Sequence, residues 1–175
     1  MNNGIFNIRK KTEIPTPSWE QLLPKLRTLS GVSSSFLNIP PNVRKFKVPI
    51  KALSTNGTSR VIAQLGTKYG LETTGYDGST QADGVTGTAW TTGAVLVQSP
   101  VAAGACTGSL TGELVDEATR LWLLEIGVGE YVSGPLVYYG FGGKALAAPL
   151  TRILLTMQNG TDTFDGGSAN VLYGY

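Results

Sequence analysis

The chain of 175 residues is a succession of short apolar or alternating segments, separated by glycine, proline and asparagine. The segments recur about every 10–15 residues, and no long helical pattern lies between them. This arrangement predicts an all-β fold, an antiparallel β-sandwich of jelly-roll-like form, and not alternating strand–helix units. The predicted strands are VSSSFLNI, VRKFKVPIKAL, SRVIAQLG, GAVLVQ, CTGSLTGELV, RLWLLEIGV, GPLVYYGFGG, LTRILLTMQ and SANVLYGY.

Residues 1–31 differ from the rest and predict an N-terminal anchoring arm ahead of a β-sandwich domain at 32–175. Three prolines favour an extended backbone in this arm. Ser18 can cap a short helix, and Pro24 would kink or end that helix. We therefore expect an extended arm that contains a short broken helix.

The arm combines basic and apolar side chains. Residues 1–51 contain nine Lys/Arg and two acidic residues, whereas residues 52–175 contain five Lys/Arg and ten acidic residues. Such an arm suits attachment to another subunit or to an acidic shell, and the alternative is that its apolar residues pack on the chain's own sandwich. The candidate anchoring residues are Arg9, Lys10, Lys11, Trp19, Leu22 and Leu23.

The side chains that most often carry out enzymatic chemistry are scarce. The chain has no histidine and a single cysteine, Cys106. Without a histidine as partner base, we expect Cys106 to be a small buried side chain. The glycine-rich segments at 127–135 and 140–149 match neither the phosphate-binding loop nor the dinucleotide-binding pattern, so they predict turns. We expect a protein that is not an enzyme and uses no cofactor.

The segment NGTDTFDGG, residues 159–167, holds two carboxylates, Asp162 and Asp165. Oxygen-rich segments can bind calcium, but this spacing is not that of an EF-hand. Asparagine and glycines bracket a polar stretch between two apolar runs, which is typical of a turn. We interpret the segment as a turn, with a cation site as the alternative.

The STNG segment at residues 54–57 lies between two predicted strands. Asn-Gly favours the two positive-φ positions of a type I′ turn. The segment therefore predicts a β-hairpin that joins VRKFKVPIKAL to SRVIAQLG.

Residues 66–92 are rich in glycine and threonine and predict a long surface loop with a short strand or two. Tyr69, Tyr76 and Trp90 in this loop are candidates for stacking on a sugar or another receptor group. For Trp90 the alternative is a place in the sandwich core or an interface.

Neither nucleic acid nor membrane is an expected partner. The β-rich part is net acidic, and the basic arm lacks an aromatic platform for bases. The chain has no run of about 18 apolar residues that could span a bilayer.

Several segments resemble β-sandwich modules in tail fibres and other virion appendages of tailed bacteriophages. The most specific is the ending LTRILLTMQNGTDTFDGGSANVLY (150–173), followed by the STNGTS segment. Looser likeness extends over residues 32–175, whereas residues 1–31 match no part of these modules. The resembling segments are LSTNGTSRVIAQLG (53–66), GLETTGYDGST (70–80), TGTAWTTGAVL (86–96) and the ending itself.

This resemblance implies a surface-exposed structural protein of the virion, assembled in the host cytoplasm, that forms homotrimers. It brings no catalytic residues. Because only a short arm precedes the module, it favours a capsid decoration (cement) protein or a short head or tail fibre, in contact with capsid or with tail and collar proteins. The alternative is a tail-fibre-type module that binds a receptor or a host-surface glycan.

Overall fold

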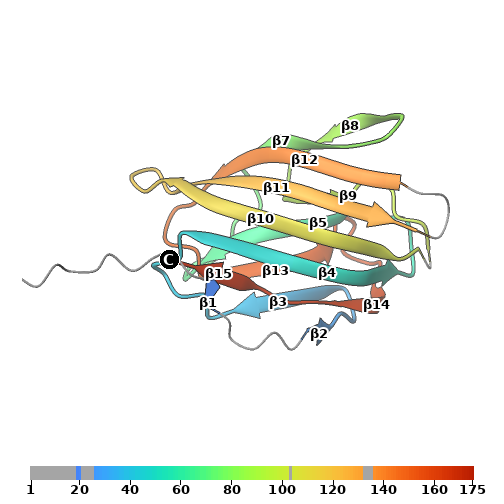
Figure 1. Ribbon diagram of the computed structural model, residues 1–175, viewed down its shortest axis with the longest axis horizontal. Coiled ribbons are helices and arrows are strands. Elements are labelled where there is room, and N and C mark those ends of the chain that lie inside the picture. Colours follow the sequence, from blue (N-terminus) through green and yellow to red (C-terminus); the bar gives the residue numbers. More distant parts are fainter. Residues whose placement is uncertain (1–18, 21–25, 103, 132–135) are drawn as a thin grey trace, which may run out of the picture.

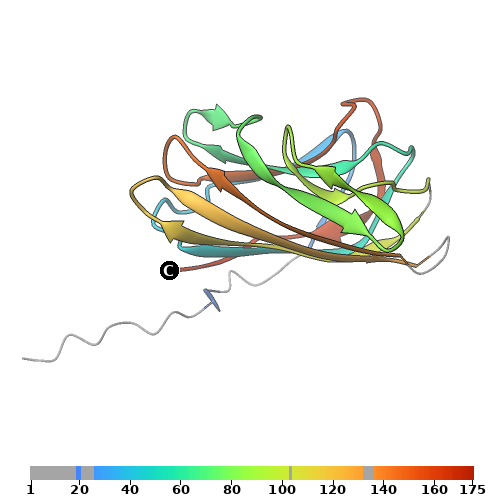
Figure 2. The same cartoon turned by 90° about the horizontal axis from the view of Figure 1, so that it is seen from above.

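The computed structural model describes residues 19–20, 26–102, 104–131 and 136–175. The strands in this part of the chain form two antiparallel sheets, which lie one over the other (Figure 1; Figure 2). The antiparallel β-sandwich expected from the sequence is confirmed. No helix occurs among the described residues, so none there is long and apolar enough to cross a membrane.

The large sheet has ten strands and the small sheet has five. In the large sheet the main strand order is β1-β15-β4-β10-β11-β12-β7-β8; β14 also pairs with β4, and β2 pairs with β14. Its strands are β1 (Trp19–Glu20), β2 (Arg27–Thr28), β4 (Lys45–Thr55), β7 (Tyr76–Ala82), β8 (Val85–Ala89), β10 (Cys106–Asp116), β11 (Leu121–Glu130), β12 (Leu136–Ala145), β14 (Phe164–Ala169) and β15 (Leu172–Gly174).

The small sheet has the order β3-β13-β5-β6, and β9 pairs with β5. These strands are β3 (Ser33–Leu37), β5 (Val61–Thr67), β6 (Gly70–Leu71), β9 (Ala94–Val97) and β13 (Arg152–Met157).

The core lies between the two sheets and follows from period-two alternation. Along β11, Trp122, Leu124, Ile126 and Val128 are buried, while the residues between them face outward. The Phe46 ring of β4 packs beside the Trp122 ring, with centroids 5.3 Å apart. Apolar side chains of both inner faces thus fill the space between the layers.

The described part of the arm belongs to the sandwich. Strand β1 pairs with β15, β2 pairs with β14, and Leu29 is buried in the core. The expected helix is not found at Trp19–Glu20 or at Arg27–Thr28, because these residues form strands. The remainder of that helix lies outside the described residues.

The expected hairpin at residues 54–57 is wrong. Strand β4 belongs to the large sheet and β5 to the small sheet, so they do not pair with each other. Neither Asn56 nor Gly57 has a positive φ. The segment instead carries the chain from one layer to the other at a corner of the sandwich.

The predicted surface loop at 66–92 is also more ordered than expected. It contains β6, β7 and β8, and seven residue pairs join β7 to β12 in the large sheet. The segment was hard to recognise because its inward positions are filled by threonine, alanine and tyrosine rather than by aliphatic residues.

Candidate functional site

The outer face of the large sheet exposes a row of large apolar side chains on β12. Val137, Tyr139 and Phe141 occupy successive outward positions and are 49%, 40% and 60% exposed. Tyr138, between them, points inward and is buried. Outward positions of a solvated antiparallel sheet are usually polar, so this row is an unpartnered apolar surface.

The neighbouring strand leaves this row uncovered. Gly127 of β11 lies opposite Tyr139, and Glu125 lies opposite Phe141. A side chain at Gly127 would meet no atom within 4 Å, so the space beside Tyr139 is open. Leu123, two positions from Glu125, adds a further apolar side chain that is 51% exposed.

A shallow groove of about 530 Å³ crosses this face from β4 to β12. Leu123 and Phe141 line it together with Thr111 of β10. We call the apolar row and this groove the outer apolar face, defined by Leu123, Val137, Tyr139 and Phe141. The outer side of the large sheet, which carries this face, is turned to the viewer in Figure 1 and lies along the lower side in Figure 2.

Charged side chains also line the groove of the outer apolar face, namely Lys45, Glu113 and Glu125. Lys45 and Lys47 of β4 lie at outward positions, and the register places Glu113 of β10 opposite Lys45. Glu125 lies two strands from Lys47 in the same cross-strand row. Exposed apolar side chains with charges beside them, which a partner can pair, are typical of a protein–protein interface.

The aromatic residues expected to bind a receptor do not share a surface. Tyr69 is exposed, but Tyr76 and Trp90 are buried in the core. The Trp90 indole N–H donates to the Thr80 hydroxyl over 2.9 Å. Trp90 thus occupies the core position weighed as its alternative, and the three-residue stacking site is wrong.

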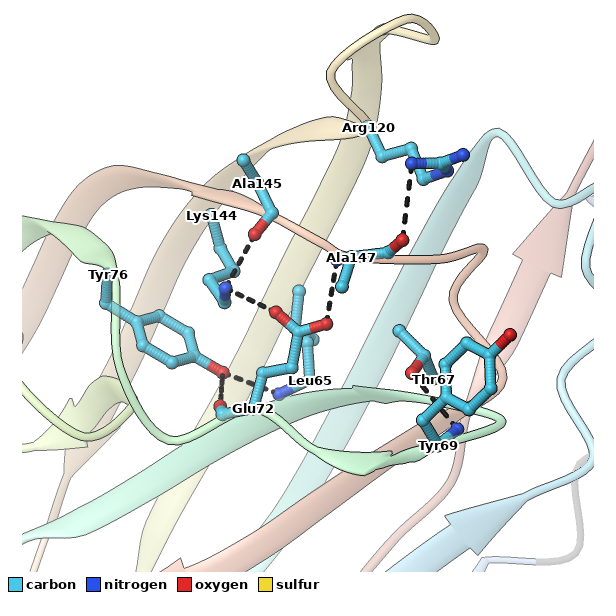
Figure 3. Close-up of polar contacts among 9 residues, drawn as sticks. All are labelled: Leu65, Thr67, Tyr69, Glu72, Tyr76, Arg120, Lys144, Ala145 and Ala147. Atoms are coloured by element: carbon cyan, nitrogen blue, oxygen red, sulfur yellow. Dashed lines mark hydrogen bonds and ion pairs between the residues drawn. The ribbon is translucent and has the colours of Figure 1, made fainter.

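Tyr76 has a structural role instead (Figure 3). Its hydroxyl accepts a hydrogen bond from the Leu65 backbone N–H at 2.7 Å and donates to the Glu72 carbonyl at 3.1 Å. Burial raises the pKa of this phenol well above its usual range. Tyr76 therefore stays neutral and ties β7 to the small sheet.

Beside Tyr76, a buried ion pair connects the two layers (Figure 3). The Lys144 ammonium of β12 lies 2.6 Å from one Glu72 carboxylate oxygen, and the other oxygen accepts the Ala147 N–H at 2.8 Å. The Lys144 side chain is 6% exposed and that of Glu72 is 21% exposed. We call this pair the Glu72–Lys144 clasp.

The other chemical candidates also have structural surroundings. Cys106 is buried as expected, and burial raises the pKa of its thiol to about 12. A thiol with this pKa is protonated at neutral pH and is a poor nucleophile.

The NGTDTFDGG segment divides into a turn and a strand. A turn follows β13 at residues 158–161, as expected, but β14 begins already at Phe164. Asp162 accepts the Ser59 N–H at 2.9 Å, whereas Asp165 is exposed on β14. Among the described residues, no group of three or more His, Cys, Asp or Glu side chains is placed to hold a metal ion.

Only one of the arm residues proposed for anchoring lies in the described part of the chain. Trp19 lies in β1. Arg9, Lys10, Lys11, Leu22 and Leu23 lie outside the described residues, so their role stays a prediction.

Sequence reasoning missed the outer apolar face. Its signal was present in LVYYGF, where both alternating sets of residues are apolar or aromatic. A strand with two apolar faces is buried on both sides or has one face free for a partner, and the sequence does not separate these cases. Comparisons of the chain with protein-family models, curated proteins and solved structures found no match.

Proposed function

We propose that this chain is a non-enzymatic structural protein of a tailed-phage virion. In this role it is a small surface component, such as a capsid decoration protein or a short head or tail fibre. It assembles as a homotrimer in the host cytoplasm and attaches to capsid or tail and collar proteins through its N-terminal arm. The resemblance of residues 150–173 to phage virion appendages supports the virion part of this proposal.

The outer apolar face supports the assembly part and is the observation that carries it. Phe141 is 60% exposed and Leu123 is 51% exposed, within one continuous sheet surface. Burying apolar area contributes about 25 cal/mol per Å², so a partner that covers this face gains stability. The lysines and glutamates on this face give a second copy complementary charges to align with.

The oligomeric state of the protein in solution reports on this assembly. We expect the intact protein to have three times the chain mass of 18.4 kDa. Phe141→Lys replaces the most exposed apolar side chain of the face by a charge, whose desolvation opposes association, so we expect the monomer mass. Size-exclusion chromatography with light scattering measures both.

The matched control is Val32→Lys, which changes a side chain that is 46% exposed outside the outer apolar face. This variant should keep the mass of the unaltered protein. A monomeric unaltered protein at tens of micromolar, or an unchanged assembly with Phe141→Lys, would contradict a role for this face in assembly.

The alternative, a receptor- or glycan-binding module, loses two of its three proposed aromatic residues to the core. Tyr69 alone keeps an exposed ring. The structural role is therefore the function that the geometry supports best.

A further inference from the structure

A hollow of about 480 Å³ lies where β13 of the small sheet begins. Two of its lining residues are cations, Lys68 and Arg152, and no acidic residue lines it. The remaining lining residues are Leu37, Asn38, Ile39, Pro40, Pro41 and Thr151.

The Arg152 side chain is held in place, but one of its N–H donors has no hydrogen-bond partner in the part of the chain that the structure describes. Its stem lies across Gly66 of β5, where a Cβ atom would come within 2.6 Å of the Arg152 Cγ. Its Nε–H is buried and has no hydrogen-bond partner among the described residues. Leaving a buried donor without a partner is costly, so such groups usually mark a missing ligand or water.

A second lining residue, Thr151, also carries a polar group without a partner within the residues that the structure describes. The Thr151 hydroxyl is buried and has no partner in the described part of the chain. Thr151 precedes Arg152, and its backbone bonds to Gly66 and Ile39 fix its position. Two adjacent lining residues thus each carry a buried polar atom without a hydrogen-bond partner among the described residues.

Lys68 adds a positive charge from another element. It lies in the turn between β5 and β6, and its ammonium is 4.8 Å from the centroid of the exposed Tyr69 ring. Glu72 does not pair with Lys68, because its two carboxylate oxygens bind the Lys144 ammonium and the Ala147 N–H. The hollow therefore keeps a positive potential.

We propose that this hollow binds a phosphate group. Its oxygens accept from the Arg152 guanidinium and the Thr151 hydroxyl, and Lys68 supplies the second positive charge. The guanidinium group of arginine suits phosphate, because two phosphate oxygens can accept two parallel N–H bonds from it. A water molecule would satisfy single donors but would leave two positive charges without a counter-charge.

The test measures phosphate affinity directly. Inorganic phosphate is titrated into the full chain by calorimetry at constant ionic strength, with chloride as the reference salt. We expect saturable binding, and a rise in melting temperature with phosphate that equal chloride does not produce. Glucose 6-phosphate and glucose form two further arms, which show whether the hollow accepts a phosphate carried by a larger molecule.

Two variants and one control locate the site. Arg152→Gln and Lys68→Gln should each weaken phosphate binding by about tenfold or more, because each removes a charge-assisted contact. Lys68 is exposed in a turn, so its variant should fold even if Arg152→Gln does not. The control Arg60→Gln changes an arginine that binds Gln158 instead of lining the hollow.

Absence of saturable phosphate binding, or equal loss in Arg60→Gln and Lys68→Gln, would overturn the proposal. Binding of inorganic phosphate without binding of glucose 6-phosphate would assign the hollow to the free ion. None of these results bears on the outer apolar face, which lies on the other sheet, so the two proposals fail separately.

Discussion

At the scale of single residues, close packing in the core requires glycine at particular positions. Gly112 of β10 lies opposite Phe46 of β4, and the Phe46 ring occupies the space that a Cβ at Gly112 would need. The distance from that Cβ to the ring would be 2.2 Å. Phe46 also packs on Trp122, so it has little room to move.

We therefore expect Gly112→Ala to lower the free energy of unfolding by about 1–3 kcal/mol through overpacking. The control is Gly87→Ala on β8, where the added Cβ would meet just one atom, 3.7 Å away. That variant should be neutral or slightly stabilising, since alanine restricts the unfolded chain. Urea denaturation measures both, and equal stability of the two variants would contradict the packing argument.

At the scale of elements, the two Asn-Gly-Thr segments form one corner of the sandwich. The Asn56 side chain accepts the Thr163 N–H at 2.8 Å, and the Asn56 N–H donates to the Thr163 carbonyl at 3.0 Å. The Asn159 N–H donates to the Ser59 hydroxyl at 3.0 Å. Each segment was predicted as an independent turn, but their polar side chains bind each other's backbone.

Asp162 makes this corner sensitive to acid. The Asn159 side chain and the Ser59 N–H hold the pKa of the Asp162 carboxyl below its usual value. The folded state therefore favours the carboxylate, and this stabilisation is present above the unfolded-state pKa and lost as the pH falls through the folded-state pKa.

We expect Asp162→Asn to lower the free energy of unfolding at pH 7, and this deficit should shrink towards pH 3. Urea denaturation at the two pH values measures it. Asp165→Asn is the control, because Asp165 is exposed and makes no hydrogen bond among the described residues. A deficit that is independent of pH would show that Asp162 does not stabilise the corner through its charge.

At the scale of the whole molecule, the two layers are joined by polar contacts as well as by the core. The Glu72–Lys144 clasp links the loop after β6 of the small sheet to β12 of the large sheet. Removing one partner of a largely buried pair leaves the other charge without compensation. The surface pair Arg44–Glu117 offers a comparison, since its side chains are 50% and 72% exposed.

We expect Glu72→Gln to lower the free energy of unfolding by about 3 kcal/mol, because the Lys144 ammonium stays buried without its carboxylate. Glu117→Gln should cost less than about 1 kcal/mol, as is usual for an exposed pair. Thermal and urea denaturation of both variants measure this difference. Similar losses in the two variants would mean that the clasp adds little to the contact between the layers.

The sequence by itself determined the fold class and most of the strands. Runs such as RLWLLEIGV alternate with a period of two, so one set of side chains must be buried, and glycine, asparagine and proline mark where the runs end. The buried Cys106 and the turn after β13 follow from the same local rules. These features depend on neighbouring residues, and the sequence displays neighbours directly.

The tertiary structure alone decided which sheet each strand joins and which side of it is covered. STNG changes layers instead of closing a hairpin, because pairing depends on strands far away in the chain. Tyr76 and Trp90 are buried since β7 pairs with β12 and the small sheet covers the inner face of that pair. Phe141 and Tyr138 have similar aromatic character, yet one is exposed and the other buried, because burial depends on which face of the strand meets another layer.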